Sequence, residues 1–213
     1  MTIERIDPVP LQERMYRVHF SDGTVLKTQD YVIFEQGLAV GKSLTPEEME
    51  QLQAAAGLAS AKNRAVRIIA SAGVSKRDLH QRLIQKGETP DHADETLRWL
   101  EELELLDDGK TAAQLVRSAV AKGYGKARIK QILYQKQIPQ EYWDDALEEV
   151  PEMDDAVDKF LAQRLRGREP DQKELKRTID ALLRRGHSWQ DIRAGLSRYS
   201  ASLEDDLEEL SYE

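Results

Sequence analysis

The chain has 213 residues and contains no cysteine, which excludes a disulfide framework and a zinc site built from thiolates. Long apolar runs are also missing, since no stretch approaches the roughly 20 apolar residues that span a membrane. The first ten residues carry acids and have no apolar core, so we expect no signal peptide. These absences favour a protein of the reducing cytoplasm that does not enter a membrane.

Residue patterns for catalysis or metal binding are also scarce. The segment from Gly37 to Ser43 resembles a Walker loop but is one residue short, because position 36 is Gln36, and we interpret it as a turn before a helix. Asp107 and Asp108 are interpreted as a helix cap. No ligand spacing is shared by His19, His80, His92 and His187. We therefore predict no enzymatic activity, no cofactor and no metal site.

The net charge of -8 conceals a strong segregation of charge along the chain. Residues 109–138 hold seven basic residues and no acidic one, whereas residues 139–158 hold nine acidic residues and no basic one. Residues 159–198 are basic again, with eleven cations and five acids. Surface helices usually mix both signs, so the cationic stretch favours a binding surface, with a solvated helix face as the alternative.

The first 60 residues combine strand and helix patterns. Apolar and polar residues alternate over 16–20, which predicts a strand. Asp22-Gly23 is a dipeptide favoured in two-residue hairpin turns, in which both positions have φ > 0. We expect residues 24–26 to form the return strand. A short apolar segment follows at 31–34.

A helix should begin after this segment. Thr45 is its cap, Glu48 closes a capping box, and Gly57 marks its expected stop after about Ala56. We therefore place a domain boundary after residue 59.

The rest of the chain is an internal repeat in helical periodicity. Gly87, Gln137 and Gly186 serve as anchors, 50 and 49 residues apart. The positions four residues before each anchor and six, ten and thirteen after it are all apolar, namely Leu83, Leu133, Leu182, Ala93, Trp143, Ile192, Leu97, Leu147, Leu196, Leu100, Val150 and Tyr199. The last three offsets lie on one face of a helix. Each repeat is therefore predicted to contain three helices.

These patterns predict a mainly α fold, with tandem three-helix repeats in an elongated curved array and a small N-terminal β-hairpin/helix domain. The predicted helices of the repeats span 60–71, 75–86, 90–103, 109–122, 125–136, 139–149, 152–167, 171–185 and 188–199. The predicted parts are 1–59, the repeats 60–108, 109–151 and 152–200, and an acidic tail at 201–213. Eight residues before the anchor, the first two repeats have the apolar residues Leu79 and Ile129, whereas the third has Thr178. We therefore expect the middle helix of the third repeat to be rotated or shifted.

The cationic stretch centres on a glycine-rich turn between two predicted helices. Gly123 and Gly125 let the backbone turn sharply, and we expect the turn to offer free amide donors at the start of the next helix. Tyr124 could stack on a base or pack against a partner. We call the predicted binding residues the basic surface: Arg117, Lys122, Tyr124, Lys126, Arg128, Lys130 and Arg184. Its continuation in the third repeat would include Arg185, Arg193 and Arg198.

Several segments resemble the RecX family of RecA regulators. The resemblance to its central motif is carried by residues 103–108, 116–118, 123–125 and 129–133, and residues 65–69 and 79–87 resemble its first module. It covers about residues 60–200, and the N-terminal part resembles an extension of some bacterial members. The chain departs from the family where Lys110-Thr111 replaces an aromatic residue and where Gln137 replaces a glycine.

The resemblance implies an inhibitor of RecA that binds in the groove of the RecA–single-stranded DNA filament. Such a protein restrains ATP hydrolysis, strand exchange and coprotease activity, and so modulates DNA repair, recombination and the SOS response. Its partners would be the RecA filament and single-stranded DNA, and we expect a cytoplasmic monomer. From the residues alone, two alternatives stay open: a DNA-binding helical module independent of RecA, and a helical protein–protein scaffold.

Overall fold

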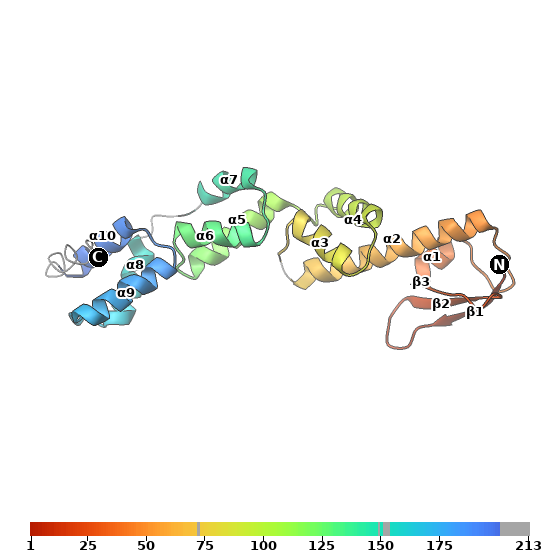
Figure 1. The fold of residues 1–213 in the computed structure, drawn as a ribbon, viewed down its shortest axis with the longest axis horizontal. Helices are drawn as coiled ribbons and strands as arrows, with labels where there is room; N and C mark the ends of the chain where they lie inside the picture. The colour runs from red at the N-terminus through yellow and green to blue at the C-terminus, as the bar shows by residue number, and fades with distance from the viewer. Residues whose placement is uncertain (72, 149, 151–153, 201–213) are drawn as a thin grey trace. The chain divides into compact units, whose positions relative to one another are not determined.

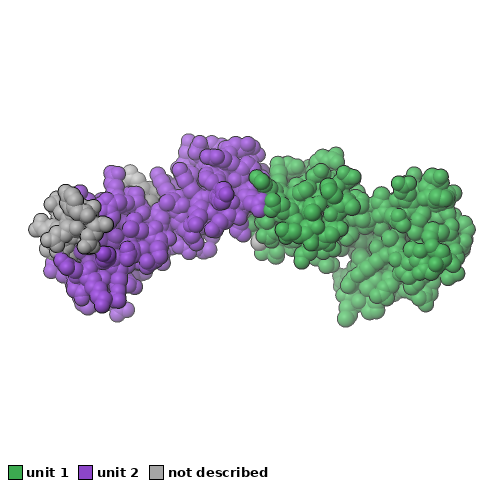
Figure 2. Space-filling model, viewed as in Figure 1, with its two compact units in different colours: residues 1–106 green, residues 107–213 purple. Residues whose placement is uncertain are grey.

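The structure, a computed structural model, describes residues 1–71, 73–148, 150 and 154–200. The chain divides into two compact units, residues 1–106 and residues 107–213 (Figure 2). The first holds a three-stranded antiparallel sheet and helices, and the second is helical in its described part (Figure 1). The predicted mainly α class with a small N-terminal β domain is confirmed. The curved array and the repeat boundaries stay predictions, and the predicted acidic tail lies outside the described residues.

The N-terminal sheet has the strand order β1-β2-β3. The predicted hairpin is formed by β2 (Met15–Phe20) and β3 (Val25–Gln29), whereas β1 (Ile3–Pro8) was not predicted. The pairing register of β1 shifts between Ile3 and Arg5. Such an irregularity breaks the alternation of apolar and polar residues by which a strand is recognised in sequence.

The hairpin turn differs from the expected two-residue type. Gly23 has φ 86°, but Asp22 does not have a positive φ, so the prediction of two left-handed residues is wrong. The Asp22 carboxylate instead accepts hydrogen bonds from the backbone N–H of Thr24 at 3.0 Å and from its hydroxyl at 2.7 Å. These bonds stabilise a turn in which glycine alone needs the left-handed region.

The Walker-like segment is a turn, as predicted. The apolar residues before it form α1 (Asp30–Glu35). Lys42 Nζ donates hydrogen bonds to the carbonyl oxygens of Gln36 at 2.9 Å and Gly37 at 3.2 Å. The lysine therefore binds the carbonyl end of α1, where a cation also meets the negative end of the helix dipole.

One long helix, α2 (Pro46–Ser71), joins the sheet domain to the first repeat. The capping box at residues 45–48 is present, with bonds of 2.8 and 3.2 Å. The predicted stop at Gly57 is wrong, and the predicted boundary after residue 59 falls inside this helix. A Cβ at position 57 would overlap the His92 ring. The glycine therefore permits close packing of another helix rather than ending its own.

The remaining helices follow the predicted repeats with small shifts at their ends. They are α3 (Lys76–Gln85), α4 (Pro90–Glu102), α5 (Asp108–Ala121), α6 (Lys126–Gln135), the 3-10 turn η1 (Gln140–Tyr142), α7 (Trp143–Glu148), α8 (Asp154–Leu165), α9 (Gln172–Arg184) and α10 (Trp189–Tyr199). Five of them begin at a side-chain cap, provided by Ser75, Thr89, Asp107, Asp171 and Ser188. The predicted caps at Asp107 and Ser188 are thus confirmed.

Each repeat has a core of its own, and the twelve apolar positions of the repeat register belong to these cores. Leu83, Leu133 and Leu182 are fully buried at the same position of the three repeats. Trp143 is half-buried in the core of the second repeat, and its indole N–H donates to the carbonyl oxygen of Ile138 at 3.0 Å. The periodicity of the sequence therefore located the cores correctly.

The middle helix of the third repeat keeps the register of the others. Thr178 is fully buried, like Leu79 and Ile129 at the equivalent position. Its hydroxyl donates to the carbonyl oxygen of Glu174 at 2.7 Å, which satisfies the polar group inside the core. The expected rotation of α9 is therefore wrong: a threonine that bonds back to its own helix can occupy an apolar position.

The three anchors share one backbone conformation. Gly87, Gln137 and Gly186 have φ values of 89°, 54° and 86°, and each follows the middle helix of its repeat. Glycine adopts this left-handed region freely, whereas other residues lose roughly 1–2 kcal/mol there. The glutamine of the second repeat therefore occupies a position that favours glycine.

We expect Gln137→Gly to raise the free energy of unfolding of residues 107–213 by about 1 kcal/mol, because it removes this steric cost. Urea unfolding followed by circular dichroism measures the change. Gly87→Gln, the reverse change at the equivalent position of the first repeat, should lower the stability by a similar amount. A destabilised Gln137→Gly protein would show that the glutamine side chain contributes more than its backbone costs.

Candidate partner-binding surface

Two lysines of the basic surface lie together. Lys126 and Lys130 are one turn apart on α6, both are exposed, and both line a groove of about 760 Å³. The rest of the groove comes mainly from the start of α8, from residues 186–188 and from α10, and it includes Asp154 and Asp191. We call this the α6–α10 groove. It combines cations from the second repeat with polar side chains of both charges from the third.

Lys122 lies in a different groove. It is the exposed C-cap residue of α5, and with Lys159 and Arg185 it lines a groove of about 410 Å³ between α5 and α8. Three other predicted residues line neither groove. Arg117 is exposed on α5, Arg184 is exposed at the end of α9, and Arg128 is half-buried and donates to the Gln131 side chain. The structure therefore does not gather all seven predicted residues into one patch.

Tyr124 is engaged within the chain. It packs against the core of the second repeat, and the Arg185 guanidinium lies 6.0 Å from the centre of its ring. Arg185 also lies 5.0 Å from the centre of the Phe160 ring, so it joins aromatic residues of two repeats. Base stacking by Tyr124 stays a prediction, but the ring already packs on both the core and Arg185.

The amides of the glycine-rich turn are not free, which corrects the expectation of an open anion site. The N–H of Gly125 donates to the carbonyl oxygen of Arg185 at 2.9 Å, and the N–H of Ala127 donates to that of Gly186 at 3.2 Å. The carbonyl end of α9 therefore binds the amide end of α6. The N-cap residue of α6 is Gly125, which has no side chain to cap the helix, and the Gly186 carbonyl instead provides an acceptor for the amide of Ala127 in the first turn.

The contact between these turns depends on two glycines. A Cβ at Gly125 would overlap the carbonyl group of Gly186, and a Cβ at Gly186 would overlap the backbone of Arg128. We call the contact of residues 123–128 with residues 185–187 the repeat junction. It is a backbone-to-backbone contact, and it includes Lys126, one of the two lysines that line the α6–α10 groove.

Two further residues hold the junction: Arg185, which was predicted as a continuation of the basic surface, and His187, which was not assigned to any site from the sequence. Arg185 Nη1 donates to the carbonyl oxygen of Lys122 at 3.1 Å, and His187 Nε2 lies 3.1 Å from the carbonyl oxygen of Gly123. His187 is only 4% exposed. Both bonds link residues more than 60 positions apart, so no local pattern in the sequence could have indicated them.

Burial lowers the pKa of His187, against smaller opposing effects of the Gly123 carbonyl and the Asp191 carboxylate. The unfolded chain therefore binds a proton more readily than the folded one. We expect stability to fall as the pH decreases through the ordinary histidine value of about 6.5, until the lowered pKa is reached. Urea unfolding at a series of pH values measures this effect. His187→Gln, which can still donate to Gly123 but does not titrate, should flatten the dependence in this range, and equal curves would contradict the assignment.

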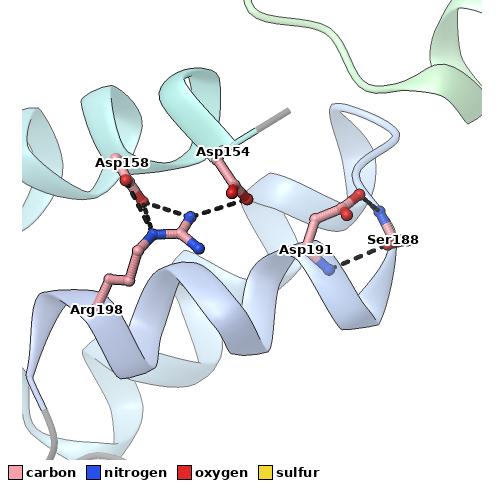
Figure 3. Close-up of polar contacts among 5 residues, drawn as sticks. All are labelled: Asp154, Asp158, Ser188, Asp191 and Arg198. Atoms are coloured by element: carbon pink, nitrogen blue, oxygen red, sulfur yellow. Dashed lines mark hydrogen bonds and ion pairs between the residues drawn. The ribbon is translucent and has the colours of Figure 1, made fainter. Parts of the chain in front are cut away.

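Arg198, predicted as a continuation of the basic surface, is instead bound within the third repeat (Figure 3). Its guanidinium contacts the Asp158 carboxylate at 2.9 and 3.0 Å and the Asp154 carboxylate at 3.0 Å. Nearby, Ser188 and Asp191 form the capping box of α10 (Figure 3). Part of the acidic segment 139–158 therefore neutralises a cation of α10 and fastens α8 to it.

Three other features of the described residues bear on metal binding, catalysis and membrane insertion. Among them, no group of three or more potential metal ligands is close enough to hold an ion. Asp107 is a helix cap, and the N–H of Lys110 lowers its pKa by hydrogen bonding to the ionised form. No helix in the described part is both long and apolar enough to cross a bilayer.

Comparison with known proteins decides the family. The sequence model of the second three-helix domain of RecX matches residues 107–147, the part that carries the junction turn and α6. The regulatory protein RecX of Halorhodospira halophila is 33% identical over 162 residues, which cover 72% of this chain and 95% of that protein. The chain belongs to the RecX family. The regulatory protein RecX of Vibrio parahaemolyticus is 31% identical over 140 residues, covering 65% of this chain and 90% of the relative.

Solved RecX structures share the fold. A crystal structure of regulatory protein RecX has a TM-score of 0.65 at 20% identity and covers 92% of this chain and 98% of its own. The RecX structure from Lactobacillus salivarius has a TM-score of 0.56 at 20% identity, over 67% of this chain and 96% of its own. The first alignment is long enough to include most of the N-terminal unit as well as the repeats.

Proposed function

We propose that this RecX-family chain inhibits RecA by binding in the groove of the RecA–single-stranded DNA filament. It would restrain ATP hydrolysis, strand exchange and coprotease activity, and thereby modulate DNA repair, recombination and the SOS response. The proposal rests on the family membership, and the exposed pair Lys126 and Lys130 beside the α6–α10 groove gives it a surface. The protein would act in the cytoplasm as a monomer, by binding and not by catalysis.

The lining of the α6–α10 groove suits a target made of protein and DNA. Lys126 and Lys130 can neutralise backbone phosphates and release counterions, which makes binding dependent on salt. Asp154 and Asp191 line the same groove; Asp154 already pairs with Arg198 and Asp191 caps α10, so a basic side chain of a protein would share these carboxylates with them. Lys122 and Arg184, both exposed, would contact the filament outside this groove.

The test is a titration of RecA ATP hydrolysis on single-stranded DNA at near-physiological salt, with DNA binding by this protein alone measured in parallel. We expect inhibition well below the concentration at which the protein coats bare DNA, because the filament offers contacts that DNA lacks. Inhibition only where bare DNA is also occupied would favour a DNA-binding module that competes for the strand. No effect in either assay would contradict the proposal and leave a protein–protein scaffold.

A further inference from the structure

A cleft of about 390 Å³ lies in the N-terminal unit between β3 and α2, far along the chain from the basic surface. Lys27, Arg64 and Arg67 line it, and no aspartate or glutamate is among its described lining residues. This is unusual in a chain with a net charge of -8. Amide and hydroxyl groups supply the other polar lining, so the cleft has the chemistry of an oxyanion site.

The continuous helix α2 places the cations of the cleft. Ser60, Arg64 and Arg67 follow one another at helical spacing and therefore share a face. Arg64 Nε is held by Glu88 Oε1 at 2.8 Å, and the Ser60 hydroxyl bonds the same oxygen at 3.1 Å. This pairing fixes the direction of the Arg64 guanidinium through a nearly buried carboxylate, while Arg67 remains exposed at the opening.

A buried hydroxyl gives a second, independent indication of a ligand. Thr28 lines the cleft and is 1% exposed, and its Oγ1 has no hydrogen-bond partner among the described residues. A buried polar group without a partner is destabilising, because it has lost its hydrogen bonds to water. A ligand oxygen in the cleft would provide the missing acceptor.

An aromatic pocket of about 480 Å³ adjoins the cleft and shares Gln29 and Asn63 with it. Tyr31, which is 40% exposed, and Trp99 line this pocket, and Lys62 Nζ lies 5.1 Å from the centre of the Trp99 ring. A basic cleft beside an exposed tyrosine ring and a half-buried tryptophan ring is an arrangement that single-stranded nucleic acid can use, since phosphates alternate with bases along the strand.

We propose that this part of the N-terminal unit binds single-stranded nucleic acid, with a backbone phosphate in the cleft and a base on the aromatic pocket. Arg64, Arg67 and Lys27 contact the phosphate, the Thr28 hydroxyl donates to one of its oxygens, and Tyr31 and Trp99 provide the stacking surface. A phosphorylated or acidic peptide would use the cleft but leave the aromatic pocket unused. The inference goes beyond the proposed function, because it needs neither RecA nor the α6–α10 groove.

The experiment measures fluorescence anisotropy of a labelled oligothymidylate with the full chain at low salt, without RecA. All variants carry Lys126→Glu and Lys130→Glu, so that binding at the basic surface is suppressed. Adding Arg67→Glu should weaken the remaining binding roughly tenfold and reduce its salt dependence. Adding Tyr31→Ala should weaken it by a similar factor through loss of stacking. Arg77→Glu, at an exposed arginine on α3, is the matched charge control and should have little effect.

Thr28→Val separates a ligand contact from a structural role. It removes a buried hydroxyl with little change of shape, so it should raise the stability of the free protein and still weaken oligonucleotide binding. Equal affinity of the Thr28→Val, Arg67→Glu and parent proteins would overturn the proposal. Inorganic phosphate and thymidine monophosphate are tested as competitors. If either displaces the labelled oligonucleotide as effectively as unlabelled oligonucleotide at the same concentration of phosphate groups, the cleft binds a free anion and the proposal is also overturned. Failure of RecA inhibition leaves this test unaffected.

Discussion

Reversing both lysines of the α6–α10 groove, Lys126→Glu with Lys130→Glu, is expected to weaken inhibition of RecA ATP hydrolysis roughly tenfold to a hundredfold. The pair changes the local charge by four units at exposed positions one turn apart on α6, where phosphates would approach. The concentration for half-inhibition, measured at several salt concentrations, reports the effect. Its dependence on salt should become shallower, because fewer counterions are released on binding.

A matched control is available in the third repeat. Lys173→Glu with Arg177→Glu makes the same change of charge at two exposed positions of α9 with the same spacing, outside both grooves. We expect this control to retain most of its inhibition. Circular dichroism and urea unfolding establish that both double variants are folded. If both double variants lose inhibition to the same extent, the assignment of Lys126 and Lys130 is wrong and the net charge of the protein determines the effect. If both inhibit as well as the unchanged protein, the assignment is also wrong.

The repeat junction should be broken by a single methyl group. Gly186→Ala forces a Cβ into the backbone of Arg128 and adds a side chain at φ 86°. We expect a loss of about 1–2 kcal/mol from the backbone conformation and about 1–3 kcal/mol more from the overlap. Hydrogen exchange of the amides of Gly125 and Ala127 should become faster, because both donate across the junction.

Gly87→Ala isolates the contribution of the contact. Gly87 occupies the equivalent position of the first repeat with φ 89°, and a Cβ there would have no heavy atom within 4 Å. The alanine should therefore bear the backbone cost alone. The difference between the two variants measures the overlap at the junction. Equal losses, with exchange at Gly125 and Ala127 unchanged, would contradict the close approach of α6 and α9.

Features with a local cause could be predicted from the sequence. The buried faces of the repeats followed from helical spacing, and Asp107 and Ser188 could be recognised as caps because a cap bonds amides only a few residues away. The sequence alignment of the repeats also placed the three residues with positive φ, Gly87, Gln137 and Gly186, at equivalent positions, although one of them is not a glycine. Exposure of Lys126 and Lys130 agreed with the cationic pattern.

Features that depend on distant residues could not be predicted. Glycine often follows the end of a helix, but α2 continues through Gly57, where the absence of a Cβ leaves room for the His92 ring. The turn at Gly125 looked like an open anion site, because nothing nearby in sequence indicates that the carbonyl groups of Arg185 and Gly186 occupy it. Arg198 was interpreted as a free cation for the same reason, since its partner Asp158 lies 40 residues earlier in the chain and Asp154 is on the same helix, α8.

Because α2 is one continuous helix, the number of residues between its two ends determines how the two cores of the first unit are rotated about the helix axis. Met49 and Leu52 of this helix belong to the core of the sheet domain, whereas Ala65 belongs to the core of the first repeat. An α-helix turns by roughly 100° and rises about 1.5 Å per residue. Inserting one residue at position 62 would therefore rotate one core against the other by more than a quarter turn. The length of α2 between these cores therefore sets the rotation of the sheet domain relative to the first repeat.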